Sequence, residues 1–280
     1  MIRMLFALLA FAPAPAGAHG AYHEVVCKLE RLLDNNPDDA DLHYRLATAH
    51  SDHEEWKLCL DELAVIERLK PGIHPTEYLR GRSLHQAGRH AEARHVLDAF
   101  IAKNPSHSGA LATRGKVLMA LGLPAEAAMD FRTVIQQTPT PGPEPYLQLA
   151  DCLRAAGQSG DALAALDDGL EKMGAIPDLL RESLELATAV EDWDLALDRI
   201  AKLRESAPRP EPWMAERARL LTKAGCTPDA RAAWSELREH MNALPNLDRG
   251  TPQNLALLTE AKTALGEPVT PPVAIPPASR

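Results

Sequence analysis

The sequence is poor in aromatic residues and lacks the common catalytic motifs. Of its 280 residues, only 4% are Phe, Trp or Tyr, although 45% are hydrophobic. It contains no HExxH zinc-protease motif, no GxSxG nucleophile motif, no Walker phosphate loop and no dinucleotide-binding glycine fingerprint. We therefore expect neither an enzyme nor a nucleotide-dependent protein, and we expect no cofactor.

Positive charge and long apolar runs are also scarce. The formal net charge is −9, whereas a general nucleic-acid binder needs a basic surface that displaces counterions. No segment reaches the roughly 18 consecutive apolar residues that a membrane-spanning helix requires. We therefore expect no nucleic-acid partner and no stable insertion into a membrane.

The chain does contain one pattern written twice between residues 74 and 139. Every member of the second copy follows its counterpart at the same distance in the sequence. The first copy consists of Gly81, Leu84, Gly88, Ala93, Leu97 and Pro105, and the second of Gly115, Leu118, Gly122, Ala127, Phe131 and Pro139. Such a fixed period, here about 34 residues, is typical of arrays of helix–turn–helix units.

Each position in the pattern has a physical reason. A glycine inside a helix costs about 1 kcal/mol relative to alanine, so Gly81 and Gly115 indicate close approach of a partner helix. Gly88 and Gly122 suit the left-handed end of a first helix. A proline such as Pro105 cannot continue a helix and therefore ends each unit.

This pattern resembles the tetratricopeptide repeat (TPR) family. The resemblance implies an all-α, right-handed solenoid of about six repeats with capping helices at both ends. The expected parts are a capping helix within 19–37, an array over 38–245 and a second capping helix over 251–265. The repeats lie near 40–73, 74–107, 108–141, 143–176, 177–210 and 211–245.

The segment 1–18 has the pattern of a secretory signal peptide. Arg3 precedes an apolar run from Met4 to Ala12, and small residues end at Ala18. Cleavage there would leave His19 as the amino terminus, so we expect a periplasmic or secreted protein. The proline-rich segment 266–280 cannot pack a core and is expected to be a disordered or extended tail.

In TPR arrays the first helices line a concave groove that binds a protein or peptide. By that resemblance, the groove candidates are Tyr44, Thr48, Tyr78, Arg82, His85, Lys116, Met119, Asp151, Arg154, Arg181, Glu185 and Arg219. Arg82, Lys116 and Arg154 form a candidate basic strip for an acidic partner. The alternative is a solvated face with ion pairs inside the helices.

Histidines gather in the first part of the chain and suggest a second function. His19, as a mature amino terminus, together with His23 is one candidate pair of ligands for copper, and His50 and His53 are further candidates. The alternative is that histidines such as His50 occupy interior positions of the repeat. The alternative function is therefore a periplasmic copper- or zinc-binding protein.

The cysteines Cys27, Cys59, Cys152 and Cys226 form no CxxC motif, which argues against a redox or zinc-ribbon role. Export makes disulfides possible, and Cys27 and Cys59, on successive second helices, are the best candidate pair. The alternative is that all four are small core residues, since Cys59 occupies the position of Ala93 and Ala127. The leading expectation for the whole chain is an exported, non-catalytic scaffold or adaptor.

Overall fold

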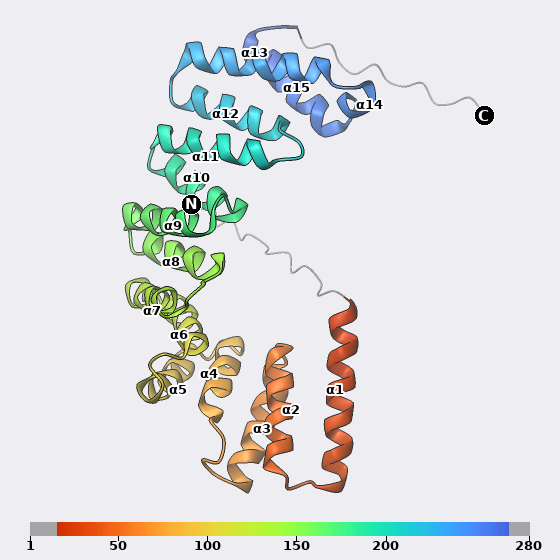
Figure 1. Ribbon diagram of the computed structural model, residues 1–280, viewed down its shortest axis with the longest axis vertical. Helices are drawn as coiled ribbons and strands as arrows, with labels where there is room; N and C mark the ends of the chain where they lie inside the picture. Colours follow the sequence, from red (N-terminus) through yellow and green to blue (C-terminus); the bar gives the residue numbers. More distant parts are fainter. Residues whose placement is uncertain (1–15, 269–280) are drawn as a thin grey trace, which may run out of the picture. The chain divides into compact units, whose positions relative to one another are not determined.

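The computed structural model describes residues 16–268, with side chains from residue 20 onward. This part of the chain contains helices and loops only. The chain forms two compact units that divide between Pro139 and Thr140 (Figure 1). The division falls within the run of alternating prolines that joins the third expected repeat to the fourth.

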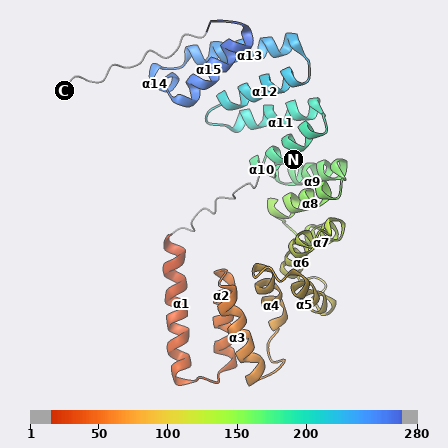
Figure 2. The same cartoon turned by 180° about the vertical axis from the view of Figure 1, so that it is seen from behind.

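Unit 1 consists of one leading helix followed by three helix pairs. The leading helix is α1 (Ala16–Asn35). The pairs are α2 (Ala40–Asp52) with α3 (Trp56–Leu69), α4 (Thr76–Gln86) with α5 (His90–Lys103), and α6 (Ser108–Ala120) with α7 (Pro124–Gln137). Within this unit, α1 packs on α2, α3 packs on α4, and α5 packs on α6 (Figure 2).

Unit 2 repeats this arrangement and closes it with an extra helix. Its pairs are α8 (Pro143–Ala155) with α9 (Ser159–Met173), α10 (Pro177–Ala189) with α11 (Trp193–Ser206), and α12 (Glu211–Lys223) with α13 (Thr227–Ala243). The short α14 (Asn246–Arg249), which the sequence did not predict, leads into α15 (Pro252–Leu265). Because α15 packs on both α12 and α13, it covers the last pair as a solenoid end requires.

The repeated glycines Gly81 and Gly115 mark a close contact within their pairs. A Cβ atom on Gly81 would lie 2.6 Å from Leu97 Cγ, and one on Gly115 would lie 2.6 Å from Phe131 Cε2. Both partner side chains are buried. The predicted close approach is therefore confirmed, and only glycine leaves room for these side chains.

The turn inside each pair uses a left-handed residue. Gly88 has φ of 74°, and the turn is closed by a 2.9 Å bond from Arg89 N–H to Leu84 O, which confirms the predicted glycine cap. Gly122 has φ of 73°. Two turns have no glycine, however: Glu54 and Glu191 adopt φ of 62° and 61° at the equivalent positions.

The cysteines divide into two classes, and none of the four forms a disulfide. Cys59 and Cys152 are fully buried, as the core interpretation predicts. Cys27 and Cys226 are exposed, so the core interpretation is wrong for these two. The suggested bridge between Cys27 and Cys59 is absent from the structure, where one thiol faces solvent and the other lies inside the α2–α3 pair.

Both ends of the chain extend beyond the described region. Residues 1–15 of the expected signal peptide and residues 269–280 of the expected tail lie outside it. Ala16, Gly17 and Ala18 are described as the first residues of α1. The signal peptide therefore stays a prediction.

Replacing Gly115 with alanine tests the close contact. The added Cβ collides with the buried ring of Phe131, and overpacking of this kind costs about 1–3 kcal/mol. We expect a lower thermal midpoint for Gly115→Ala, measured by circular dichroism.

Gly20→Ala is the matched control, because Gly20 lies in α1 with no atom within 4 Å of its added Cβ. It should raise the midpoint, since alanine is favoured in helices by about 1 kcal/mol. Equal effects of the two substitutions would contradict the contact.

Candidate functional site

The predicted groove residues all lie on the first helices of the pairs, and none of them is buried. Unit 1 contributes Tyr44, Thr48, Tyr78, Arg82, His85, Lys116 and Met119 from α2, α4 and α6. Unit 2 contributes Asp151, Arg154, Arg181, Glu185 and Arg219 from α8, α10 and α12. In unit 1, α4 packs against both α2 and α6, so the candidates of this unit belong to one row of adjacent helices.

A cavity of about 740 Å³ opens at the α1 end of this row. The predicted residues Tyr44 and Thr48 line it from α2. The other lining residues are Ala21, Tyr22, Val25, Arg45, Ala49, Asp52 and His53. The described part of α1 occupies the place of a second helix without a first helix beside it, which leaves this face open.

Aromatic stacking holds the tyrosines of the row in place. The Tyr44 ring stacks on His74, with centroids 4.5 Å apart and planes inclined by 11°. The Tyr78 ring lies against His107, with centroids 4.7 Å apart, and against Phe100. His74 and His107 come from the loops that follow second helices, and each packs against one of the two rings.

The arginines of the expected basic strip already have acidic partners. Arg82 donates to Asp52 at 2.9 Å, across from α4 to α2. Arg154 donates to Asp151 at 2.5 Å on its own helix and lies 3.7 Å from Glu182. The ion-paired alternative therefore describes both arginines, although only the Arg154–Asp151 pair lies within one helix. Lys116 is exposed on α6.

The other two arginine candidates of unit 2 are paired in the same way. Arg219 makes two bonds of 2.7 and 2.6 Å to Glu260 and another of 3.0 Å to Glu216. Arg181 donates to Asp178 at 3.3 Å. The four arginines among the candidates therefore all have acidic partners, and the basic strip stays a prediction.

His85 lies at the end of α4 and faces a second imidazole. Its Nδ1 atom is 3.2 Å from Nδ1 of His90. Burial, together with electrostatic repulsion from His90 and Lys116, lowers the pKa of His85. A neutral His85 is consistent with one ring nitrogen donating a proton to the other.

Three of the four candidate metal ligands, His23, His50 and His53, lie around Tyr22 of α1. The Tyr22 ring stacks on His53 with centroids 3.9 Å apart, and its hydroxyl lies 2.9 Å from Nδ1 of the buried His50. His23 is exposed, and the side chain of His19 lies outside the described region. The interior interpretation of His50 is therefore confirmed.

Within the part of the chain whose side chains are described, no three His, Cys, Asp or Glu residues are placed to hold a metal ion together. Among the helices of that part, none is both long and apolar enough to span a bilayer.

Sequence reasoning missed the contribution of α1 to the cavity. Tyr22 and Val25 have no counterpart in the repeat pattern, because that pattern begins with the first complete pair. The available signal was that α1 has two adjacent valines. Val26 is buried, and Val25 is exposed beside it.

The chain resembles known helical-repeat proteins. The tetratricopeptide repeat family matches residues 78–140. The C-terminal part of a TPR repeat-containing protein from Cytophaga hutchinsonii is similar in structure, with a TM-score of 0.65 and 15% identity, over 86% of this chain and 95% of that one.

Two further structures are similar. PilF from Pseudomonas aeruginosa has a TM-score of 0.53 and 22% identity, over 71% of this chain and 91% of its own. Yeast Tom70 has a TM-score of 0.52 and 17% identity, over 90% of this chain and 61% of its own. No curated protein sequence matches. These likenesses establish the all-α fold of stacked TPR-type pairs.

Two histidines of α2 should affect stability with opposite pH dependence. His43 Nδ1 lies 2.5 Å from Glu62 and its Nε2 lies 2.9 Å from Pro37 O. Burial opposes protonation of His43, but these hydrogen bonds outweigh it and raise its pKa. Its stabilising contribution is complete below the unfolded pKa of 6.5 and is lost as pH rises through the folded value.

His50 behaves in the reverse way, because burial lowers its pKa. Its contribution is complete above pH 6.5 and is lost as pH falls towards the folded value. We therefore expect the thermal-midpoint difference between wild type and His43→Ala to grow as pH falls from about 8 to 5. The difference between wild type and His50→Leu should shrink over the same range. Parallel changes in the two differences would contradict the assignment.

Proposed function

We propose that this protein is an exported scaffold or adaptor that binds a protein or peptide partner along its first-helix row, without catalysis of its own. The observation that carries the proposal is the open row of unit 1, which ends in the 740 Å³ cavity. TPR-type folds generally serve protein interactions, and the family match over residues 78–140 lies almost wholly within this unit.

The lining of the cavity favours an amphipathic segment with an apolar anchor. Tyr22, Val25 and Tyr44 offer an apolar wall, while Arg45 and Asp52 provide charges at its edge. An apolar side chain buried there gains about 25 cal/mol per Å² of surface removed from water. Because the cavity lies where a first helix would pack on α1 and α2, a helical segment of the partner matches its shape.

Export is the second component of the proposal. It is supported by the basic residue, the apolar run and the small residues that precede His19. An exported chain would meet its partner in the periplasm or outside the cell. Within such an assembly, the two units would present two rows of first-helix side chains for contact.

Site-specific photo-crosslinking in the native cell tests the groove assignment. Benzoylphenylalanine at Thr48 or Met119 should form a crosslink to one recurring partner, identified by mass spectrometry. The same residue at Ala99 or Arg132, exposed on second helices α5 and α7, is the matched control. A partner that crosslinks equally from the control positions would overturn the assignment.

Intact mass of the protein purified from its native route tests export. We expect a chain that begins at His19, and a mass that includes residues 1–18 would contradict cleavage. Metal analysis of the same sample tests the alternative function. About one copper or zinc per chain, lost when an extra residue precedes His19, would favour metal binding through His19 and His23.

A further inference from the structure

Each unit contains two grooves in which successive second helices flank a first helix. Three corresponding positions, one on each helix and evenly spaced in the sequence, can be compared between the grooves. They are Ala64, Arg80 and Val96 in the α3/α4/α5 groove, and Asp98, Arg114 and Asp130 in the α5/α6/α7 groove. In unit 2 they are Asp167, Ser183 and Arg199 in the α9/α10/α11 groove, and Ala201, Arg217 and Ala233 in the α11/α12/α13 groove.

In the α5/α6/α7 groove, all three positions carry charged residues that are joined by ion pairs. Arg114 donates to both oxygens of the buried Asp130, at 2.9 and 2.6 Å, and to Asp98 at 2.8 Å. These hydrogen bonds raise the pKa of Arg114 despite its partial burial. The guanidinium thus joins three helices through two carboxylates, which is a strong and directional form of ion pairing.

The two grooves of unit 2 also give their arginine a carboxylate. In the α9/α10/α11 groove, Arg199 is buried, donates to Ser183 at 3.0 Å and forms an ion pair with Asp167. In the α11/α12/α13 groove, both flanking positions are alanine. There Glu236 from α13 takes their place and accepts from Arg217 at 3.3 Å. In each of these two grooves the arginine therefore has a carboxylate partner, although the partner comes from a different position.

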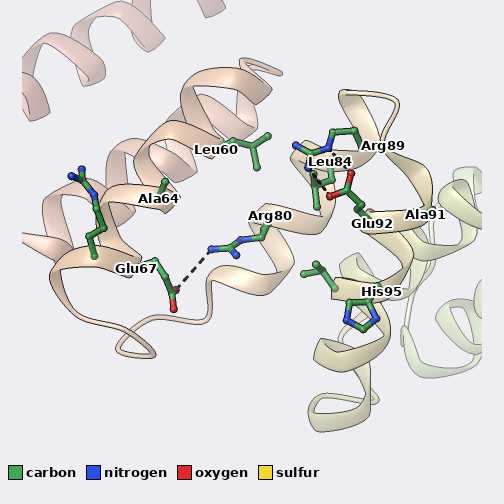
Figure 3. A pocket seen from close by; sticks show the side chains of 11 residues that line it. Leu60, Ala64, Glu67, Arg80, Leu84, Arg89, Ala91, Glu92 and His95 are labelled. Atoms are coloured by element: carbon green, nitrogen blue, oxygen red, sulfur yellow. Dashed lines mark hydrogen bonds and ion pairs between the residues drawn. The ribbon is translucent and has the colours of Figure 1, made fainter.

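The α3/α4/α5 groove is the exception among these four. Ala64 and Val96 stand where Asp98 and Asp130 stand one repeat later. Within the described region, Arg80 donates no hydrogen bond, and its ion pair with Glu67 is loose, at 3.8 Å. Figure 3 shows the Arg80 guanidinium between α3 and α4, joined to Glu67 by that single contact.

The missing carboxylates coincide with a larger space. The α3/α4/α5 groove holds a cavity of about 770 Å³, compared with 320 Å³ in the α5/α6/α7 groove and 290 Å³ in the α11/α12/α13 groove. Its apolar lining residues come from all three helices. They are Leu60, Ala64, Leu84 and Ala91, which Figure 3 labels, and Val96. Arg68 and Arg89 also line it, as do Glu67, Glu92 and His95. Arg89 is already paired with Glu92, at 2.7 and 2.6 Å, which leaves Arg68 as the second guanidinium that can face a ligand.

We propose that this cavity binds an aliphatic carboxylate. The carboxylate of the ligand takes the place of Asp98 and Asp130 and accepts hydrogen bonds from Arg80, while its hydrocarbon chain lies on Leu60, Leu84 and Val96. The volume lies within the range of about 300–1,000 Å³ that is usual for small-molecule sites. The cavity shares no lining residue with the predicted groove, so this site is independent of the proposed scaffold function.

The α5/α6/α7 groove, in which Arg114 binds two carboxylates, indicates why Arg80 would bind the carboxylate of a ligand. A guanidinium whose only ion pair is loose, like that of Arg80, gains more from a carboxylate than one that is already hydrogen-bonded to two carboxylates. The apolar walls add a term proportional to the hydrocarbon surface that they remove from water. A ligand with only one of the two features, an alcohol or a short acid, therefore binds more weakly.

Titration of the full chain with decanoate, below its micelle concentration, tests the site by calorimetry and NMR. We expect saturable binding to wild type and a loss of about tenfold or more in affinity for Arg80→Gln. Decanol and acetate should each bind much more weakly than decanoate. Equal binding of decanol, or unchanged binding to Arg80→Gln, would overturn the proposal.

A second variant reconstructs the complete groove instead of removing the anchor. Val96→Asp places a carboxylate where Asp130 holds Arg114, so it should satisfy Arg80, keep the helical circular dichroism spectrum and abolish decanoate binding. Thr48→Arg, in the cavity beside α1, should leave decanoate binding unchanged. Full decanoate affinity in folded Val96→Asp would overturn the assignment of Arg80, and loss of binding in Thr48→Arg would move the ligand to the other cavity.

Discussion

The close contact between the two helices of a pair is the constraint on which the rest of the structure depends. Gly81 and Gly115 bring their helices near enough for Leu97 and Phe131 to fill the space where a Cβ would stand. Once two helices are fixed at that distance, their remaining apolar faces can be buried only by the next pair. The separation into first-helix and second-helix surfaces follows from this stacking.

The glycine caps and the buried positions of the repeat could be predicted from the sequence. Gly88 and Gly122 are left-handed caps, and Cys59 occupies the same buried position as Ala93, because each residue type has one physical use at its place in the repeat. The fold could be predicted because the pattern recurs, and every copy supports the interpretation of the others.

Surface pairings could not be predicted in the same way. Arg82 reaches Asp52 across two helices, and a long side chain has several acidic neighbours within reach on a repeat surface. Because several partners were possible, the sequence did not show that Arg82 and Arg154 of the expected basic strip are paired with acidic residues. The cavity beside α1 could not be predicted either, because α1 precedes the first complete copy of the repeat pattern. Cys27 faces solvent for a related reason: within residues 16–268, no helix precedes α1 against which its outer side could pack.

The α2–α3 pair is bordered by both larger cavities, one beside α1 and the other beside α4 and α5. Its connecting turn is also one of the two in which glutamate adopts a left-handed conformation, at Glu54. For a residue with a side chain, that conformation costs about 1–2 kcal/mol. In a repeat array such a cost stays within the pair and its neighbours. Local opening of unit 1 is therefore expected to begin at α2–α3, so the backbone amides of this pair exchange with solvent sooner than those of α6–α7, whose turn has the glycine.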